Sequence, residues 1–288
     1  MLHILLKGRL GNNLFQIAAG ASLAKANGDA FCVSVPDKVN DPGLSTSLSE
    51  LRNLQKTILR KVEIREEWIT QDATYSEEQF NYEPIPYQPE MSISGYFQSE
   101  KYFDKQLVRE LFAIDEGTKK YILDKYGKIL AQDVTSIHIR RGDYLKNIDV
   151  HPICSMDYFR RTIRLIGNEK PFLVVSNDIE WCKKQFKGEN FFFAENESAV
   201  VDLYLQSLCA NNIISNSSFS WWGAWLNANP EKKVLVPDPW FGISTKNMDS
   251  SDLIPEGWAK VPNRMPVYLQ TFAILRKAKR DLYHFLKK

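Results

Sequence analysis

A histidine, two arginines and a carboxylate fall within the segment SIHIRRGDY at 136–144, at the end of a predicted strand. Such a density of charge indicates a site for an anionic ligand. Side chains alternate between the two faces of a strand, so His138 and Arg140 share one face while Arg141 points away. We therefore predict that Arg140 faces the ligand. Its planar guanidinium suits phosphate oxygens and can neutralise a departing nucleotide diphosphate.

Arg141 is predicted to be a structural residue that pairs with Asp143. Asp143 is also the nearest carboxylate that could serve as a general base beside Arg140. The competing interpretation of the whole segment is a buried ion-pair network that holds a turn and binds no ligand.

A second polar run, NSSFS, follows another predicted strand and precedes a predicted helix. Hydroxyl side chains and backbone N–H groups at a helix start suit a phosphate. Capping a helix needs only one such side chain, so Ser217 and Ser218 are predicted to bind phosphate. The tryptophans that follow are predicted to pack in the core instead: Trp221, Trp222 and Trp225.

The segment KGRLGNNLFQ at 7–16 joins the first predicted strand to the first predicted helix. It matches neither the dinucleotide-binding pattern G-x-G-x-x-G nor a Walker A loop. Gly11 lets a backbone approach closely, and Asn12 offers both a donor and an acceptor at the mouth of the first sheet.

Asp178 ends the strand-end segment VSND. A carboxylate can accept the two N–H groups of guanine, so Asp178 is a candidate reader of the base. It is equally placed to cap the helix that follows, and the sequence leaves both roles open.

No two aspartates have the D-x-D spacing with which many nucleotide-sugar transferases hold a divalent metal. We therefore expect no metal and no cofactor. The charge of a leaving group would be met by arginine, hydroxyls and helix N-termini.

The composition indicates an ordinary globular protein, and a length of 288 residues favours two lobes. A net charge of +2 argues against a nucleic-acid partner.

The cysteines are widely spaced, as is typical of reduced thiols in the cytoplasm. The apolar stretch at the start of the sequence is too short for a signal peptide. No other stretch reaches the ~18 apolar residues of a membrane span. We expect a cytoplasmic location.

Apolar strands alternate with helical segments, which predicts parallel βαβ units with the polar motifs at strand ends. The predicted strands are 2–6, 31–35, 134–139, 172–175, 191–193, 213–215 and 233–236. The predicted helices are 14–26, 158–166, 179–186, 199–209 and 221–226, with a helical pattern over 104–133. The stretch 36–89 is polar and unpatterned.

Four ordered segments resemble the signature blocks of the bacterial α-1,2-fucosyltransferase family. They are GRLGNNLFQIA at 8–18, GYFQSEKYF at 95–103, HIRRGDY at 138–144 and NSSFSWWGAWL at 216–226. The resemblance implies an α/β fold of GT-B type, with two Rossmann-like lobes and a cleft between them. The expected parts are an acceptor-side lobe at 1–133, a GDP-fucose-binding lobe at 134–262 and a basic amphipathic helix at 263–288.

The resemblance further implies metal-independent, inverting transfer of L-fucose from GDP-β-L-fucose to the 2-hydroxyl of a terminal galactose. The acceptor would be a galactose-terminated oligosaccharide or a lipid-linked glycan, as in O-antigen biosynthesis. Residues 36–90 are expected on the acceptor side, and the sequence does not identify the acceptor. Two alternatives stay open: a fucosyltransferase of α-1,3 or α-1,6 linkage or with another donor, and a non-catalytic GDP-sugar- or glycan-binding protein.

By the same resemblance, Arg140 grips the β-phosphate, while His138 and Asp178 contact guanine. Gly11 and Asn12 approach the fucose. The residues near the phosphates are Ser217, Ser218 and Phe219. The predicted catalytic residues are Arg140, Asp143 and Asn12. Inversion requires either a base or an oxocarbenium-like transition state that needs little base strength, and the sequence does not decide between them.

The segment 267–288 carries six Lys or Arg residues and one Asp. Its apolar residues recur at helical spacing, opposite Arg276, Lys277 and Arg280. Such a helix suits an anionic membrane surface, which predicts peripheral contact with the inner face of the membrane. The alternative is a terminal helix packed on the body with a solvated charged face.

Overall fold

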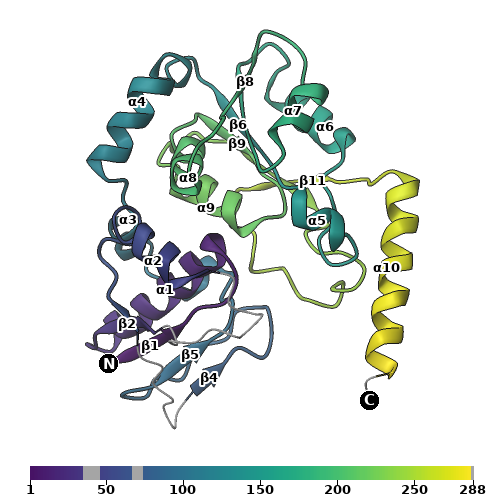
Figure 1. Cartoon of the computed structure of the whole chain (residues 1–288). Coiled ribbons are helices and arrows are strands. Elements are labelled where there is room, and N and C mark those ends of the chain that lie inside the picture. Colours follow the sequence, from purple (N-terminus) through teal and green to yellow (C-terminus); the bar gives the residue numbers. More distant parts are fainter. Residues whose placement is uncertain (35–45, 67–73, 287–288) are drawn as a thin grey trace. The chain divides into compact units, whose positions relative to one another are not determined.

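The computed structural model describes residues 1–34, 46–66 and 74–286. Residues 36–45 and 67–73 of the predicted acceptor-side stretch lie outside the described residues, as does residue 35 at the end of a predicted strand. The chain forms two compact units (Figure 1). One contains Met1–Tyr121 and Asp249–Pro255, and the other contains Ile122–Met248 and Glu256–Lys288.

The first unit is built on a parallel sheet with the strand order β3-β2-β1-β5-β4. Its strands are β1 (Leu2–Leu5), β2 (Phe31–Ser34), β3 (Ile64–Arg65), β4 (Thr74–Ser76) and β5 (Ser92–Ser94). Its helices are α1 (Leu10–Ala26), α2 (Leu48–Leu54), the 3-10 turn η1 (Glu100–Tyr102) and α3 (Lys105–Leu111). Helix α4 (Glu116–Leu130) continues from this unit into the second.

Helix α1 begins at Leu10, earlier than the predicted start at residue 14. Gly8 has a φ of +77°, which turns the chain sharply after β1. The carbonyl of Arg9 then accepts the N–H groups of Asn12 and Asn13, at 2.8 and 3.0 Å. Asn12 therefore lies in the first turn of a helix and not in a loop.

The second unit contains a parallel sheet with the order β11-β10-β9-β6-β7-β8. Its strands are β6 (Thr135–Ile139), β7 (Phe172–Ser176), β8 (Phe191–Phe193), β9 (Asn211–Ile213), β10 (Val234–Asp238) and β11 (Ala259–Pro262). Its helices are α5 (Gly142–Lys146), α6 (Met156–Ile166), α7 (Ile179–Gln185), α8 (Ala199–Ser207), α9 (Ser218–Leu226) and α10 (Val267–Leu286).

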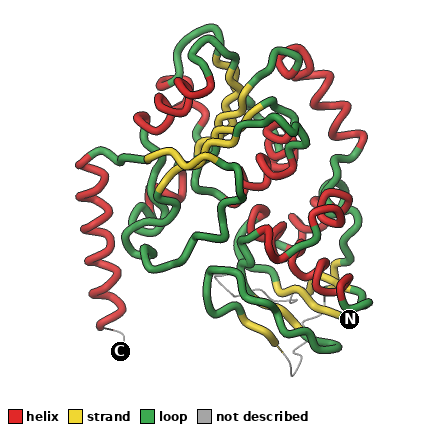
Figure 2. Tube along the Cα trace, turned by 180° about the vertical axis from the view of Figure 1, so that it is seen from behind, coloured by secondary structure: helices red, strands yellow, loops and turns green. Residues whose placement is uncertain are grey.

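Helices cover both faces of this second sheet, whose strands are the central group in Figure 2. Tyr158 and Phe159 of α6 pack with Ile137 and Ile139 of β6 in one core cluster. Alternation then turns His138 toward the opposite face, where α8 and α9 lie (Figure 1). On that side the three predicted core tryptophans, Trp221, Trp222 and Trp225, are buried, which confirms their assignment.

The two parallel sheets with flanking helices confirm the predicted fold class of two Rossmann-like α/β lobes. In each sheet the first strand of the unit lies in the interior of the sheet. The next two strands along the chain are added on one side of it, and the later strands lie on its other side. Such a reversal leaves a crevice at the carboxyl ends of the two central strands, where open α/β sheets bind ligands. The reversals fall between β1 and β5 and between β6 and β9.

Candidate functional site

His138 lies at the strand reversal of the second unit, near the end of β6. Its side chain is 4% exposed, and its Nδ1 lies 2.8 Å from Oγ of Ser215, which follows β9. Burial, with a smaller contribution from the charge of Arg140, lowers the pKa of His138 to about 3. The imidazole is therefore neutral at physiological pH, and its ring lies 5.3 Å from the ring of Phe219 in α9.

Arg140 follows β6 directly and pairs with Asp143. Its Nη2 lies 2.9 Å from Oδ2 of Asp143, and its guanidinium lies 5.6 Å from the ring of Tyr144. The prediction that Asp143 pairs with Arg141 is wrong. The strand ends at Ile139, so alternation no longer applies to the residues that follow. The first turn of α5 places Asp143 beside Arg140, three residues earlier in the chain.

Arg141 instead pairs with Asp178, with Nε 3.1 Å from Oδ2. Its guanidinium also lies 3.8 Å from the ring centroid of Trp181, and its backbone N–H donates to Asn177. Asp178 occupies the N-cap position of α7, but its side chain makes no capping bond within the described part of the chain. The capping role is therefore not what this carboxylate does, and the contact with guanine stays a prediction.

Ser217 occupies the N-cap position of α9, again without a side-chain capping bond among the described residues. The loop before it is held by Ser220, whose hydroxyl donates to the carbonyls of Ser215 and Ser217 at 3.2 Å each. The first turn of α9 carries no acidic side chain. The helix therefore presents its positive end at the same edge of the sheet as His138.

Tyr144 joins the loops that follow β6 and β9. Its hydroxyl donates to the carbonyl of Asn216 at 3.0 Å, and the amide of Asn216 donates to the carbonyl of Trp240 at 3.0 Å. Burial raises the pKa of Tyr144 to about 12, so the phenol keeps its proton. These bonds place Arg140, His138 and the start of α9 around one strand reversal.

Gly11 and Asn12 belong to the first unit, at its own strand reversal. Oδ1 of Asn12 accepts from Nε2 of Gln98 at 2.9 Å, and Nε2 of Gln16 donates to the carbonyl of Gly95 at 2.8 Å. The segments that follow β1 and β5 are thereby joined. The four signature blocks thus lie in two pairs, one pair at each reversal.

Glu77 is a residue that sequence reasoning missed. Its carboxylate accepts the backbone N–H groups of Tyr96 and Phe97, at 2.6 and 3.0 Å, and so holds the loop that carries Gln98. Burial raises the pKa of Glu77. A Cβ on Gly95 would lie 2.4 Å from Cβ of Glu77, so only glycine fits there. No motif marks Glu77, which stands beside Glu78 in an unpatterned stretch.

Asp202 of α8 was also missed. Its Oδ1 is buried and has no hydrogen-bond partner among the described residues. Burial, followed by the nearby charge of Glu197, raises the pKa of Asp202 to about 7. Helix α8 packs on α9, and a Cβ on Gly223 would lie 2.8 Å from Cβ of Gln206. The available signal was a single acid within the apolar run AVVDLYL.

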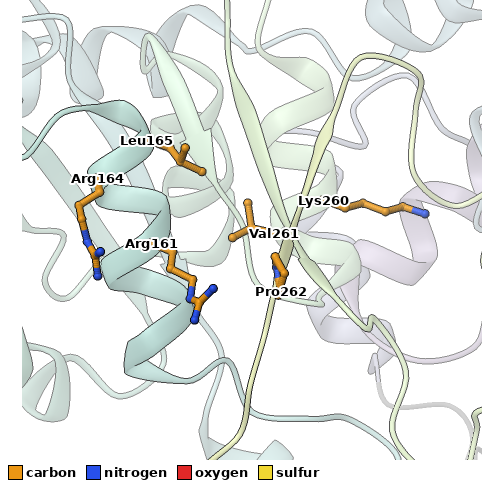
Figure 3. A pocket seen from close by; sticks show the side chains of 6 residues that line it. All are labelled: Arg161, Arg164, Leu165, Lys260, Val261 and Pro262. Atoms are coloured by element: carbon orange, nitrogen blue, oxygen red, sulfur yellow. The ribbon is translucent and has the colours of Figure 1, made fainter.

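A hollow of about 380 Å³ lies elsewhere in the second unit, between α6 and β11 (Figure 3). Its lining residues are Arg161, Arg164, Leu165, Lys260, Val261 and Pro262. None of the predicted site residues lines it, and Lys260 points away from the two arginines (Figure 3). The strand reversals, and not this hollow, hold the candidate chemistry.

The described residues contain no group of three His, Cys, Asp or Glu side chains that could hold a metal ion. The positive groups at the reversal of the second sheet are the Arg140 and Arg141 side chains and the start of α9. The arrangement is suited to binding a phosphate-bearing ligand.

Comparisons with known proteins give a family and a fold. The family model of Glycosyl transferase family 11 matches residues 1–249. An α-1,2-colitosyltransferase of Escherichia coli is 37% identical over 58% of this chain and 61% of its own length. The O-antigen biosynthesis glycosyltransferase WbnK of Escherichia coli is 35% identical over 56% of this chain and 58% of its own length.

A galactoside α-(1,2)-fucosyltransferase 1 of Sus scrofa is 25% identical over 76% of this chain and 63% of its own length. The chain thus spans about three fifths of each of these relatives. Among solved structures, the NodZ α-1,6-fucosyltransferase crystallised with GDP superimposes with a TM-score of 0.51 at 12% identity, over 77% of this chain and 90% of that one. At that identity the likeness supports the fold alone.

Proposed function

Because the chain belongs to Glycosyl transferase family 11, we propose that it transfers L-fucose from GDP-β-L-fucose to the 2-hydroxyl of a terminal β-galactoside. The product would carry an α-1,2 linkage, formed with inversion. The relatives named as α-1,2-fucosyl- and α-1,2-colitosyltransferases support this linkage. The relative named for O-antigen biosynthesis supports a glycan acceptor. This acceptor would be a free oligosaccharide or a glycan linked to lipid.

One observation carries the proposal. Arg140 stands at the reversal between β6 and β9, paired with Asp143 and 5.6 Å from the ring of Tyr144, whose hydroxyl donates to Asn216 just before α9. In this role Arg140 meets the charge that develops on the β-phosphate as the bond to fucose breaks. Ser217, Ser218 and Phe219 would line the phosphates. His138 would stay neutral and donate or accept one hydrogen bond to guanine.

We propose that the reaction needs no divalent metal, since arginine and helix-end charge can supply the stabilisation. Asp143 is bound to Arg140, and we propose that it orients the guanidinium instead of acting as the base. An oxocarbenium-like transition state then requires little basicity around the acceptor hydroxyl. Asn12 and Gly11 would approach the fucose from the first unit's helix start.

The test is product analysis with purified full-length chain, GDP-β-L-fucose and lactose in EDTA. We expect 2′-fucosyllactose, identified by NMR of the linkage. A 3- or 6-linked product would contradict the linkage. Activity that appears only after a divalent metal is restored would contradict the metal-independent mechanism. Hydrolysis or binding of the donor without transfer would favour a non-catalytic sugar-binding protein.

A second donor has specific support, because a colitosyltransferase is 37% identical to this chain. Under this alternative the GDP-linked sugar is colitose and the rest of the site keeps its role. Competition between the two donors at equal concentration decides between them. The preferred donor is the one with the higher kcat/KM.

We also propose peripheral contact of α10 with an anionic membrane surface on the cytoplasmic side. The described helices include none long and apolar enough to cross a membrane. Among the large apolar side chains of α10, those exposed to solvent include Tyr268, Ile274, Leu275, Leu282, Phe285 and Leu286. With Val267, Phe272 and Tyr283, which are also exposed, they cover about half of the helix circumference at about 100° per residue. That width suits the interface of a bilayer better than a narrow coiled-coil seam.

Point substitutions test this contact better than deletion of α10, which would also disturb the packing of the unit. Leu275→Ser with Leu282→Ser should reduce co-sedimentation with vesicles of anionic lipid while leaving transfer to soluble lactose unchanged. Leu165→Ser, which changes an exposed apolar residue outside α10, is the matched control. Unchanged co-sedimentation of the Leu275/Leu282 double variant would contradict the proposed membrane contact.

A further inference from the structure

Asp149 is a fully buried carboxylate that binds the C-terminal helix. Its side chain is 0% exposed, and Arg280 of α10 approaches both of its oxygens, with Nε at 2.9 Å and Nη2 at 3.2 Å. The hydroxyl of Ser244 adds a third bond at 2.9 Å. Burial alone would raise the pKa of Asp149, but the bonds from Arg280 and Ser244 outweigh it and hold the pKa below its ordinary value.

The same helix packs on the segment that carries Asp149. Ala273 of α10 is buried in a small cluster with Ile148 and Ile153, and Leu269 packs against that cluster. Tyr144 and Leu145 of α5 also pack there. Helix α10 therefore contacts the segment 142–153 by apolar packing at its start and by an ion pair near its end.

That segment leads directly to Arg140. Tyr144 lies against the guanidinium of Arg140 at 5.6 Å and donates to the carbonyl of Asn216. The ring of Tyr144 stacks on His151 with 4.6 Å between centroids and 15° between planes. His151 is two residues from Asp149, and the N–H of His151 donates to the carbonyl of Asn147. One short compact segment thus connects Arg280 to Arg140.

Backbone hydrogen bonds fix the loop 242–244 to the other side of Asp149. The N–H of Ser244 donates to the carbonyl of Asp149, and the N–H of Gly242 donates to that of Val150, at 2.8 and 2.9 Å. A Cβ on Gly242 would lie 2.4 Å from the carbonyl oxygen of Asp149. Asp149 is therefore held between this loop and α10, and loss of Arg280 leaves a buried charge without its counter-ion.

We propose that Arg280 is a positioning residue for the donor site. Through Asp149 it holds the segment 142–151, and so keeps Tyr144 and Asp143 in place around Arg140. The inference rests on the proposed function insofar as that site binds a GDP-sugar. Helix α10 is then a support of the site as well as an outer surface of the unit.

The test measures GDP binding by calorimetry and hydrogen exchange by mass spectrometry on the full chain. In Arg280→Ala we expect the Kd for GDP to rise about tenfold, a loss typical of indirect supporting residues. Arg280→Lys keeps the charge but loses the two-point geometry, so its Kd should lie between those of the wild type and Arg280→Ala. Lys279→Ala, an exposed change on the same helix, should match the wild type.

Exchange distinguishes positioning from a general loss of stability. Arg280→Ala should speed exchange of the amides in 142–151, with little change in the strands of the sheet. For transfer, the KM for GDP-fucose should rise while the KM for the acceptor stays constant. A folded Arg280→Ala chain with unchanged GDP affinity and unchanged exchange in 142–151 overturns the proposal.

If Arg280→Ala does not fold, Arg280→Lys and Ser244→Ala test the same proposal. Each weakens the hydrogen bonds that hold Asp149 and retains a cation beside it. Unchanged Kd and exchange in both would overturn the positioning role. A wild-type chain that binds no GDP contradicts the proposed function as well. GDP binding that is present in the wild type and equal in the Arg280 variants contradicts only the role of Arg280.

Discussion

The guanidinium of Arg140 lies 2.9 Å from the carboxylate of Asp143, three residues further along the chain. This pair limits what each residue can do. The carboxylate holds the guanidinium of Arg140 in one orientation, as a site that binds phosphate requires. The same contact occupies the carboxylate that was the nearest candidate for a catalytic base.

Asp143→Asn separates an orienting role from a base. The amide oxygen can still accept from Arg140, so we expect kcat to fall only about tenfold and the pH profile to keep its shape. Loss of a general base would instead reduce the rate by about 10²–10⁴-fold and remove the acidic limb of the profile. The measurement is kcat against pH for wild type and variant, with Asp157→Asn on α6 as a control.

Asp202→Asn tests the carboxylate of α8, whose buried Oδ1 has no hydrogen-bond partner among the described residues. The pKa is raised in the folded state to about 7, so stability is fully present below the unfolded pKa and is lost as pH rises through 7. The asparagine amide does not ionise, so the variant does not lose this stability as pH rises. The variant should gain stability relative to the wild type at pH 8, by at most about 4 kcal/mol, and gain little at pH 4.

Thermal unfolding at the two pH values measures this difference directly. Glu256→Gln, which changes an exposed carboxylate in the same unit, should show no such dependence on pH. An equal change in Tm for Asp202→Asn at pH 4 and pH 8 would mean that the carboxylate is not buried as a charged group above pH 7.

Glu77→Ala should destabilise the first unit. It leaves the N–H groups of Tyr96 and Phe97 without their acceptor, and a lost buried partner costs about 1–3 kcal/mol. Glu77→Gln keeps one acceptor oxygen and should cost less. Urea unfolding followed by tyrosine and tryptophan fluorescence gives both values, with the exposed Glu78→Ala as the control. Identical midpoints for all three variants would rule out Glu77 as the anchor of this loop.

The sequence predicted the alternation of strands and helices well where the elements are long and apolar, as in β6 and β7. It missed β3, β4 and β5, since these strands contain only two or three residues each and lie in polar surroundings. Strand alternation was the basis for giving Arg140 and Arg141 different roles. It then failed for their partners, because alternation ends with the strand and the turn of α5 decides which residue Asp143 meets.

The buried supports of the site were invisible to pattern reasoning for a different reason. The pair between Asp149 and Arg280 joins residues 131 positions apart, and Glu77 meets a loop 19 positions away. Neither contact leaves a local spacing in the sequence. The sequence predicted that the apolar and basic residues of 267–288 lie on opposite sides of one helix. It did not predict which side packs on the second unit, because that depends on the ion pair between Arg280 and Asp149.

The most direct test of the central claim is the turnover of Arg140→Ala with GDP-fucose and lactose in EDTA. If Arg140 stabilises the departing diphosphate, kcat should fall by about 10²–10³-fold or more, while the KM for lactose stays constant. Arg161→Ala, which removes a guanidinium from α6 in the same unit, should retain full turnover. Wild-type kcat in a folded Arg140→Ala chain would contradict the account.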